Sequence, residues 1–402
     1  MGLNGAFVTG DLFNLFVFFE VLLIASYALM LHGQGRERLR IGVHYVVLNL
    51  VVSALFLVGV SLLYALTGTL NFADLALRVP KVTGPDAVVL QAAALILLVV
   101  FGFKAALMPL AMWLPATYAA ASAPVAALFA IMTKVGVYAI LRVHGVVFGA
   151  DAGDSAFTVQ PLLLPLALVT AVVGVLGALA AHTLPRLIGW LTVGSVGTVL
   201  AALGLFRAES WSAALYYMAH STLVMAGLFL LAELVAAQRG EVGDRLEPAP
   251  PVAQPALLGT MLLLAAASSA GLPPLPGLIG KLMILEAALP HTSAVAVWGV
   301  VLTVGFLTLL GLARAGSILF WSVRHEQPSE ASAASPRLVM ATLALLGLGV
   351  AMSAFAEPLK RYTDAAAAQL LDRRAYAEAV LGLPGLATET TRPYRIAPGA
   401  VK

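Results

Sequence analysis

Five titratable side chains lie within long apolar stretches of the sequence: Glu20, Lys104, Lys134, His220 and Lys281. An ionisable group at the depth of the bilayer hydrocarbon is costly, so it normally faces a protein interior or a water-filled cavity. A carboxylate there is either protonated or paired with a cation. Lysine and histidine side chains near such an acid can take up and release protons as their partners change. The five residues therefore predict a buried proton relay.

Four of these residues also have a structural interpretation. Glu20 could be a helix-packing acid that bonds a backbone group. Lys104 could snorkel to the end of its helix, roughly 9 Å away at 1.5 Å per residue. Lys134 lies near the centre of its apolar stretch, where snorkelling is harder. His220 has no acidic neighbour in the sequence and could equally be a structural hydrogen-bonding residue.

Prolines interrupt two of the same apolar stretches. Pro109 follows Lys104 by five residues, and the run GLPPLPGLIG precedes Lys281 directly. Proline removes a backbone hydrogen bond and tends to kink or end a helix. Within a membrane, a broken helix is tolerated only where protein or water satisfies the freed backbone groups, and in transporters such breaks often mark the ion path. A lysine beside a helix break is therefore a stronger indication of an ion path than a lysine or a break alone.

The composition indicates the kind of chain that must position these groups. The 402 residues are 61% hydrophobic and 11% charged, whereas soluble domains carry roughly 25% charged residues. Since a spanning helix needs about 20 mainly apolar residues, the sequence predicts an all-α, polytopic membrane protein of about ten transmembrane helices, two of them broken. The predicted spans are 8–31, 41–67, 86–110, 123–148, 160–182, 186–206, 211–237, 255–290 (broken), 294–322 and 336–357.

The remaining segments complete the predicted organisation. A transmembrane domain covers 1–357, with a first half-bundle at 1–150, a second at 158–322 and an extra helix at 336–357. Residues 71–78 are expected to form a short interfacial helix. Small, apolar and charged residues alternate over 358–382, which is typical of an amphipathic surface helix. The tail from Leu383 has no core to join and is expected to be extended or disordered.

The loops give an orientation. Arginines collect in the loops near 32–40, 183–186, 238–254 and 323–336, while the opposite loops carry only Arg78, Lys81 and Arg207. Since positively charged loops stay in the cytoplasm, the first set is predicted to be cytoplasmic.

Several classes of site are absent from the sequence. The chain has no cysteine, which excludes disulfides, thiolate metal sites and iron–sulfur clusters. It has no phosphate-binding loop, no dinucleotide fingerprint and no zinc-protease motif, and its histidines lack ligand spacing. We therefore expect no cofactor and no metal centre. The net charge of +3 fits cytoplasmic loops and does not imply nucleic acid.

Three segments carry a resemblance to a known family: TGDLFNLFVFFEVLLIASYALM, GFKAALMPLAMWLP followed by SAPVAALFAIMTKVGVYAILR, and GLPPLPGLIGKLMIL. They resemble the D subunit of Mrp-type (Mnh/Pha) multisubunit cation/proton antiporters, which is similar to the antiporter-like membrane subunits of respiratory complex I. The likeness extends to about residue 357.

The resemblance implies an inverted-repeat bundle in which Glu20 is the mid-helix glutamate, Lys104 the lysine of the first broken helix and Lys134 the connecting lysine. Lys281 would be the terminal lysine of the second broken helix, a position that is often a glutamate in the complex I relatives. Many relatives place a lysine shortly after the histidine that matches His220, and this chain does not. Since the family has about fourteen helices, the chain would begin at the fifth and be N-terminally truncated, lacking the first helices of the bundle.

The resemblance also implies partners and a location. The chain is expected in the bacterial inner (cytoplasmic) membrane, within the lipid bilayer, with other subunits of a multisubunit antiporter complex and with protons and Na+ or K+ as transported ions. The predicted function is a proton-translocating subunit of a multisubunit Na+(K+)/H+ antiporter.

Two other functions remain open. The chain could be a proton-pumping, antiporter-like subunit of a complex I-like NADH:quinone oxidoreductase or a membrane-bound hydrogenase; otherwise we expect a transporter subunit rather than an enzyme. It could also be a non-transporting scaffold in which buried lysines merely pair with acids.

Overall fold

The computed structural model describes residues 1–33, 35–322 and 334–382. In these segments, nine helices are long and apolar enough to cross a membrane, by length and composition. The helices that carry these nine spans are α2 (Leu12–Leu31), α3 (Arg36–Thr67), α5 (Pro85–Ala105), α7 (Ala123–Ile140), α8 (Gln160–Leu179), α9 (Leu184–Leu203), α10 (Ala208–Ala236), α13 (Ala294–Phe320) and α14 (Pro336–Ala354). The tenth predicted span, 255–290, is a pair of shorter helices, α11 (Pro255–Ala270) and α12 (Pro276–Ala288). The prediction of an all-α, polytopic membrane protein with about ten spans is confirmed.

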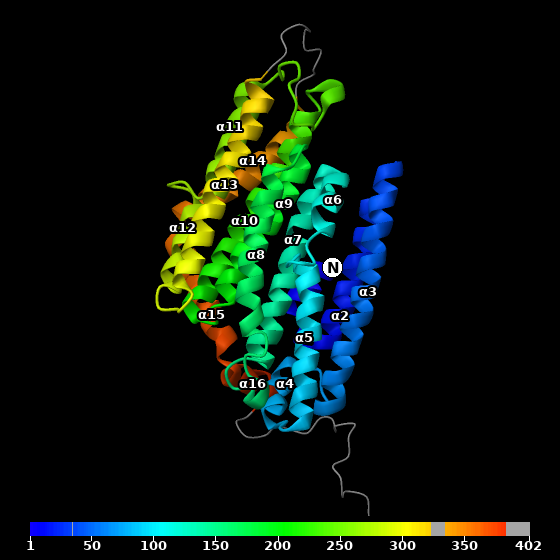
Figure 1. The fold of residues 1–402 in the computed structure, drawn as a ribbon, viewed down its shortest axis with the longest axis vertical. Coiled ribbons are helices and arrows are strands. Elements are labelled where there is room, and N and C mark those ends of the chain that lie inside the picture. The colour runs from blue at the N-terminus through cyan, green and yellow to red at the C-terminus, as the bar shows by residue number, and fades with distance from the viewer. Residues whose placement is uncertain (34, 323–333, 383–402) are drawn as a thin grey trace, which may run out of the picture.

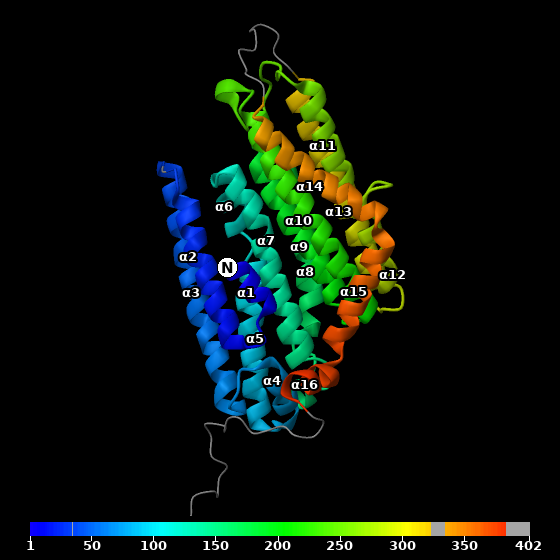
Figure 2. The ribbon, with the colours of Figure 1, turned by 180° about the vertical axis from the view of Figure 1, so that it is seen from behind.

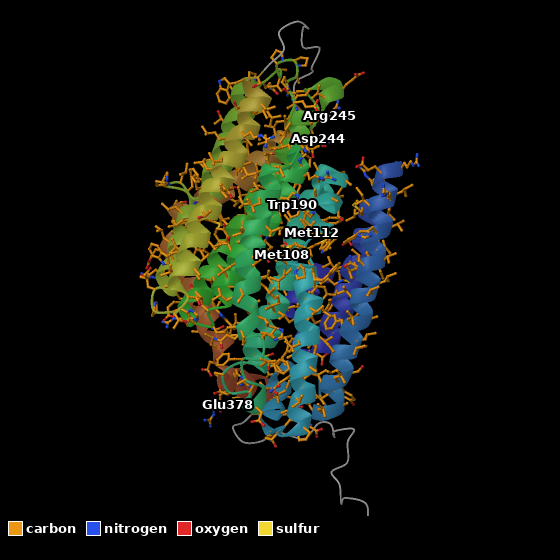
Figure 3. The ribbon with its side chains drawn as sticks, viewed as in Figure 1. Met108, Met112, Trp190, Asp244, Arg245 and Glu378 are labelled. Atoms are coloured by element: carbon orange, nitrogen blue, oxygen red, sulfur yellow. The ribbon has the colours of Figure 1, made fainter. Side chains whose placement is uncertain are left out.

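Both predicted breaks are present. The first separates α5 from α6 (Trp113–Ala120), and the second separates α11 from α12. The predicted span 86–110 was too long, because α5 already ends at Ala105. Pro109 accounts for this end, since a proline ring clashes with the carbonyl group four residues earlier. Met108 and Met112 lie in the first break, near the middle of the long axis of the molecule (Figure 3).

The first two spans begin at residues other than those predicted. The first span begins at Leu12 rather than residue 8, because Asp11 caps α2 by accepting a hydrogen bond from the Asn14 N–H at 2.8 Å. A short helix, α1 (Gly2–Val8), precedes this cap. The second span begins at Arg36 rather than residue 41, so part of the predicted basic loop is helical. Arginine, glutamate and leucine are good helix formers, which explains the extension.

Short elements close the two ends of the bundle. The predicted interfacial helix is α4 (Phe72–Arg78), followed by the 3-10 turn η1 (Val79–Lys81); α7 continues into a π-helical turn, η2 (Leu141–Val147). Two further 3-10 turns are η3 (Gly153–Ser155) and η4 (Gly240–Val242). The predicted surface segment 358–382 forms α15 (Ala356–Leu371) and α16 (Arg373–Leu381). The tail from Leu383 lies outside the described residues, and the half-bundle boundaries stay a prediction.

The helices form an elongated bundle (Figures 1 and 2). The loop 238–254, the end of α6 and the start of α3 lie towards one end, where Asp244 and Arg245 are labelled in Figure 3. Helices α4 and α16 lie at the opposite end (Figure 2). Helix α9 is the most enclosed span and packs against α6, α8 and α10. It therefore joins the first half of the chain to the second.

Candidate functional site

Lys104 lies at the end of α5, next to the first break, with only 6% of its surface exposed. Its ammonium Nζ donates a hydrogen bond to Asn49 Oδ1 of α3 at 2.8 Å. Glu20 of α2 is close enough to act electrostatically on the lysine, and its Oε1 accepts a hydrogen bond from Ser53 Oγ of α3. Lys104 therefore points into a polar cluster and does not snorkel to a membrane surface.

Helix α3 supplies one polar face to this cluster. Tyr45, Asn49 and Ser53 are spaced four residues apart and are all buried. This spacing places the three side chains on one side of the helix. The amide of Asn49 also donates to the Tyr45 carbonyl at 2.8 Å, which leaves its oxygen directed to Lys104. Asn49 and Ser53 were not among the predicted residues, although their spacing within an apolar span was a visible signal.

Lys281 lies in the first turns of α12, on the other side of the second break, and is 7% exposed. Its Nζ donates to two backbone carbonyls at the end of α11, to Ser269 O at 3.0 Å and to Ala270 O at 2.7 Å. The last carbonyls of a helix have no intrahelical partner and carry partial negative charge. The lysine therefore satisfies the end of the half-helix that the break exposes.

His220 of α10 belongs to the same cluster as Lys281. Its ring is 1% exposed, hydrogen-bonds the backbone of Ser268 and interacts electrostatically with Lys281. Close packing holds this contact, because a Cβ atom at Gly277 would lie 1.8 Å from Ser268 O and 3.0 Å from His220 Nε2. The other ring nitrogen, Nδ1, is buried without a hydrogen-bond partner within the described part of the chain.

Lys134 stands apart from both clusters. It lies in α7, is 2% exposed, and its Nζ has no hydrogen-bond partner among the residues that the structure describes. Helix α7 packs against α5 and α10, which carry Lys104 and His220. The five predicted residues thus form two clusters, Glu20 with Lys104 and His220 with Lys281, and one separate lysine on the helix between them.

A small cavity adjoins Lys281. It has a volume of about 20 Å³, which is room for about one water molecule. Hydroxyl-bearing side chains from four helices line it together with Lys281: Ser195, Thr198, Tyr217, Ser269 and Thr308. The lysine head therefore lies next to a polar space within the second half of the chain.

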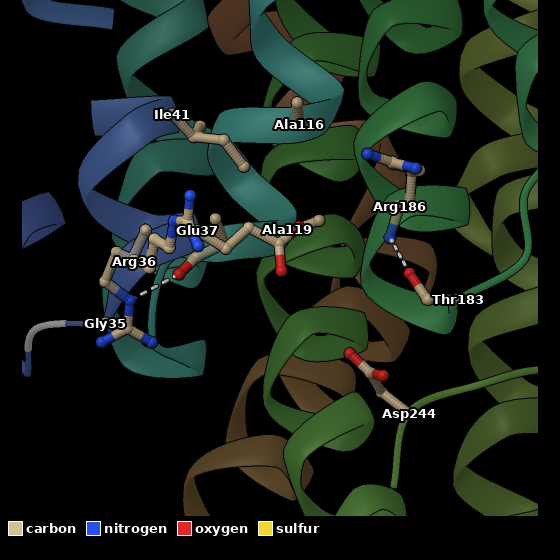
Figure 4. Close-up of a pocket in the computed structure, with 11 residues that line it drawn as sticks. Gly35, Arg36, Glu37, Ile41, Ala116, Ala119, Thr183, Arg186 and Asp244 are labelled. Carbon is tan, nitrogen blue, oxygen red and sulfur yellow. Dashed lines mark hydrogen bonds between the residues drawn. The ribbon is translucent and has the colours of Figure 1, made fainter. Parts of the chain in front are cut away.

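A larger polar pocket of about 450 Å³ opens at the end of the molecule that carries Asp244 (Figure 4). The start of α3, the end of α6 and the start of α9 form its walls. Arg38 fixes the end of α6 by donating from Nε to the Ala120 carbonyl at 2.8 Å. Burial raises the pKa of Asp244, which lies in the loop at its rim. The pocket brings charged side chains to the end of the first broken helix.

The chain matches a known family over most of its length. Residues 9–311 match the family described as "NADH:quinone oxidoreductase/Mrp antiporter, TM". A protein of Rhizobium meliloti, named as the D subunit of a probable K(+)/H(+) antiporter, is 40% identical over 95% of this chain and 76% of its own length. The D subunit of a Na(+)/H(+) antiporter of Alkalihalophilus pseudofirmus is 39% identical over 94% of this chain and 76% of its own length.

A solved structure gives the same result. A chain of the Mrp complex from Dietzia sp. DQ12-45-1b superimposes with a TM-score of 0.82 at 29% identity, covering 95% of this chain and 78% of that chain. The predicted resemblance is therefore confirmed, and the chain is a multi-pass membrane protein that belongs to the NADH:quinone oxidoreductase/Mrp antiporter membrane-subunit family.

Proposed function

We propose that this chain is the proton-translocating D subunit of a multisubunit Na+ or K+/proton antiporter in the bacterial inner membrane, acting with the other subunits of that complex. The two relatives described above are named as D subunits of cation/proton antiporters. Neither name decides between Na+ and K+ for this chain.

The observation that carries the proposal is the position of the two lysines. Lys104 and Lys281 are buried beside the two helix breaks, and each donates hydrogen bonds to polar groups of another element. Charged groups at membrane depth serve transport more often than packing, because their burial is costly. Broken helices supply the free backbone groups that can hold them.

The relay that we propose runs through Glu20, Lys104, Lys134, His220 and Lys281. Glu20 and Lys104 can share a proton within the first cluster, and His220 and Lys281 can do so within the second. Lys134 would connect them, because its helix packs against the helices that carry Lys104 and His220. The charged pocket of Figure 4 offers water an approach to the first half from the arginine-rich end of the molecule.

A second function is supported by the family description, which covers subunits of NADH:quinone oxidoreductases as well as antiporters. In such an assembly, electron transfer elsewhere would drive the same relay, and this chain would again serve only as the proton path. The two functions differ in the driving force, so a measurement of the driving force separates them.

The test is cation-dependent dissipation of a pH gradient in vesicles that carry the whole gene cluster. We expect Na+ or K+ to dissipate the gradient, and we expect Lys104→Ala to abolish this response because the relay loses a titratable group. Lys81→Ala is the matched control, since Lys81 is exposed at the end of the 3-10 turn η1, and it should keep the response.

Assembly of both variants would be checked on native gels. An assembled Lys104→Ala complex with wild-type exchange would reject the relay. Proton movement that required quinone reduction and ignored both cations would favour the second function.

A further inference from the structure

We propose that the oxygen atoms around Lys281 form a binding site for a dehydrated alkali cation, and that the Lys281 ammonium group occupies this site in competition with the cation. The inference rests on the proposed antiporter function and deepens it, because it names where the exchanged cation would bind in this chain.

The first part of the site is the end of α11. The Gly271 N–H donates a hydrogen bond to the Ala267 carbonyl at 3.1 Å, and the Leu272 N–H donates to the same carbonyl at 2.9 Å. The carbonyls of Ser269 and Ala270 therefore remain for Lys281, at 3.0 and 2.7 Å from Nζ. Backbone carbonyls at the C-terminal ends of half-helices coordinate alkali cations in transporters. The ammonium group of Lys281 is placed where such a cation would sit.

The second part is the cavity beside the lysine. Its volume of about 20 Å³ is close to that of one water molecule, which is room for one dehydrated alkali cation. Hydroxyl oxygens retain lone pairs even when they donate a hydrogen bond. Thr308 of α13 and Ser195 of α9 both line this cavity and can therefore add ligands to the two carbonyls.

Glycines keep the surroundings of the lysine head open. A Cβ atom at Gly305 of α13 would lie 3.2 Å from Lys281 Nζ and 3.0 Å from Ala270 O. A Cβ atom at Gly271 would lie 3.4 Å from Nζ, and Gly271 has a φ of +87°, which favours glycine. Both positions leave room for a ligand at the end of α11.

The charge balance around Lys281 also supports an exchange of a proton for a cation. The cavity lining includes no carboxylate, so the lysine charge is balanced by neutral oxygen dipoles alone. The exchange can be written Lys–NH3+ plus Na+ gives Lys–NH2 plus bound Na+ plus a released proton. The site carries a single positive charge before and after the exchange. One proton is therefore released for each cation bound, which is the coupling that an antiporter requires.

Other titratable groups around Lys281 are few. His220 and Tyr217 face it from α10. Helices α8 and α11 have no titratable side chain. Arg314 of α13 is directed away to the Leu179 carbonyl, and Arg186 of α9 lines the pocket at the end of the molecule. Protonation of Lys281 or of His220 would oppose cation binding, and the variants below separate the two.

The experiment measures equilibrium binding of radioactive Na+ to the purified complex as a function of pH. For the wild type, we expect the apparent affinity to fall by up to about tenfold for each unit by which the pH is lowered, because protons compete with Na+. Lys281→Met should make the affinity independent of pH, whereas His220→Gln should keep the competition.

Thr308→Val tests the ligands without touching a charge. It should weaken Na+ binding by about tenfold, the effect of one lost polar contact, with the pH dependence retained. Thr342→Val is the matched control, since Thr342 is a buried threonine of α14 whose hydroxyl donates to Leu338 O of its own helix. Its Na+ affinity should equal that of the wild type.

The outcomes distinguish this site from the proposed function. If vesicles exchange Na+ for protons but Lys281→Met retains the wild-type pH dependence, or Thr308→Val binds like Thr342→Val, the site is wrong and the antiporter stands. If Na+ binding depends on Lys281 and Thr308 but vesicles show no exchange, the site stands and the antiporter function is wrong.

Discussion

The two helix breaks hold their lysines in different ways. Lys104 belongs to the helix before its break and donates to a side chain, Asn49 Oδ1, with Glu20 nearby. Lys281 belongs to the helix after its break and donates to the backbone carbonyls that the break exposes. At the first break, Trp113 Nε1 donates to the Phe103 carbonyl at the end of α5, at 3.1 Å. A tryptophan therefore satisfies a terminal carbonyl of α5, whereas a lysine satisfies the terminal carbonyls of α11.

This difference separates two kinds of chemistry. A lysine with a nearby carboxylate can pass a proton to it, and the pair becomes neutral without any ion entering. A lysine held by neutral carbonyls leaves partial negative charge behind when it loses its proton, and another cation can neutralise that charge. The first break is suited to moving protons, and the second to exchanging a proton for a cation.

The largest expected effect is a loss of stability when a methyl group is added at a glycine that packs closely against the backbone beside a break. A Cβ atom at Gly277 would lie 1.8 Å from Ser268 O, and one at Gly136 would lie 2.5 Å from the Ala105 nitrogen. Since backbone atoms cannot move aside cheaply, we expect Gly277→Ala and Gly136→Ala each to cost about 3 kcal/mol or more. Thermal unfolding in detergent would show the loss.

Gly299→Ala is the control for both variants, because nothing lies within 4 Å of its added Cβ. Alanine also favours a helix over glycine by about 1 kcal/mol, so this variant should be no less stable than the wild type. A Gly277→Ala protein as stable as Gly299→Ala would show that the contact between α11 and α12 is looser than described.

The next effect distinguishes the two lysines by their partners. Asn49→Ala removes the side chain that bonds Lys104 and should cost about 2 kcal/mol, the range for a hydrogen bond to a charged group. It should leave the pH dependence of Na+ binding unchanged, because that dependence is assigned to Lys281.

Asn14→Ala serves as the comparison, since Asn14 lies exposed on α2 and its removal should change stability by less than about 0.5 kcal/mol. Equal stabilities of the two variants would mean that Asn49 does not support Lys104. A changed pH dependence in Asn49→Ala would mean that the two breaks are not independent.

The sequence alone predicts the two helix breaks but not the hydrogen-bond partners of Lys104 and Lys281. Pro109 and the run at Pro273, Pro274 and Pro276 identified both interruptions, because proline acts on its own helix. The partners of the lysines depend on how neighbouring helices are rotated against one another, which local sequence does not encode. Asn49 could have been found from its spacing to Tyr45 and Ser53, since that pattern is periodic.

Other features had no signal in the sequence. The acceptors of Lys281 are backbone carbonyls, which every residue carries, so no residue type marks them. The separation of Lys134 from both clusters likewise depends on packing. The sequence predicted a relay of five residues, whereas the structure describes two clusters and one separate lysine.

The smallest effect tests whether Glu20 and Lys104 act as a pair, as the comparison requires. Glu20 accepts its hydrogen bond from Ser53 and acts on Lys104 only through space, so its effect on the lysine is modest. We expect Glu20→Gln and Lys104→Met to couple by about 1 kcal/mol in a double-mutant cycle, because the second change costs less once the first partner is gone. The free energy of unfolding of the four proteins gives the coupling directly.

The control cycle combines Glu20→Gln with Lys281→Met. Lys281 is held by carbonyls of α11 in the second half of the chain, and the contacts that hold it include none from Glu20. The two changes should therefore add within about 0.5 kcal/mol. If both cycles gave the same coupling, the carboxylate would act on the two lysines alike. The first break would then lack the local acid that distinguishes it from the second.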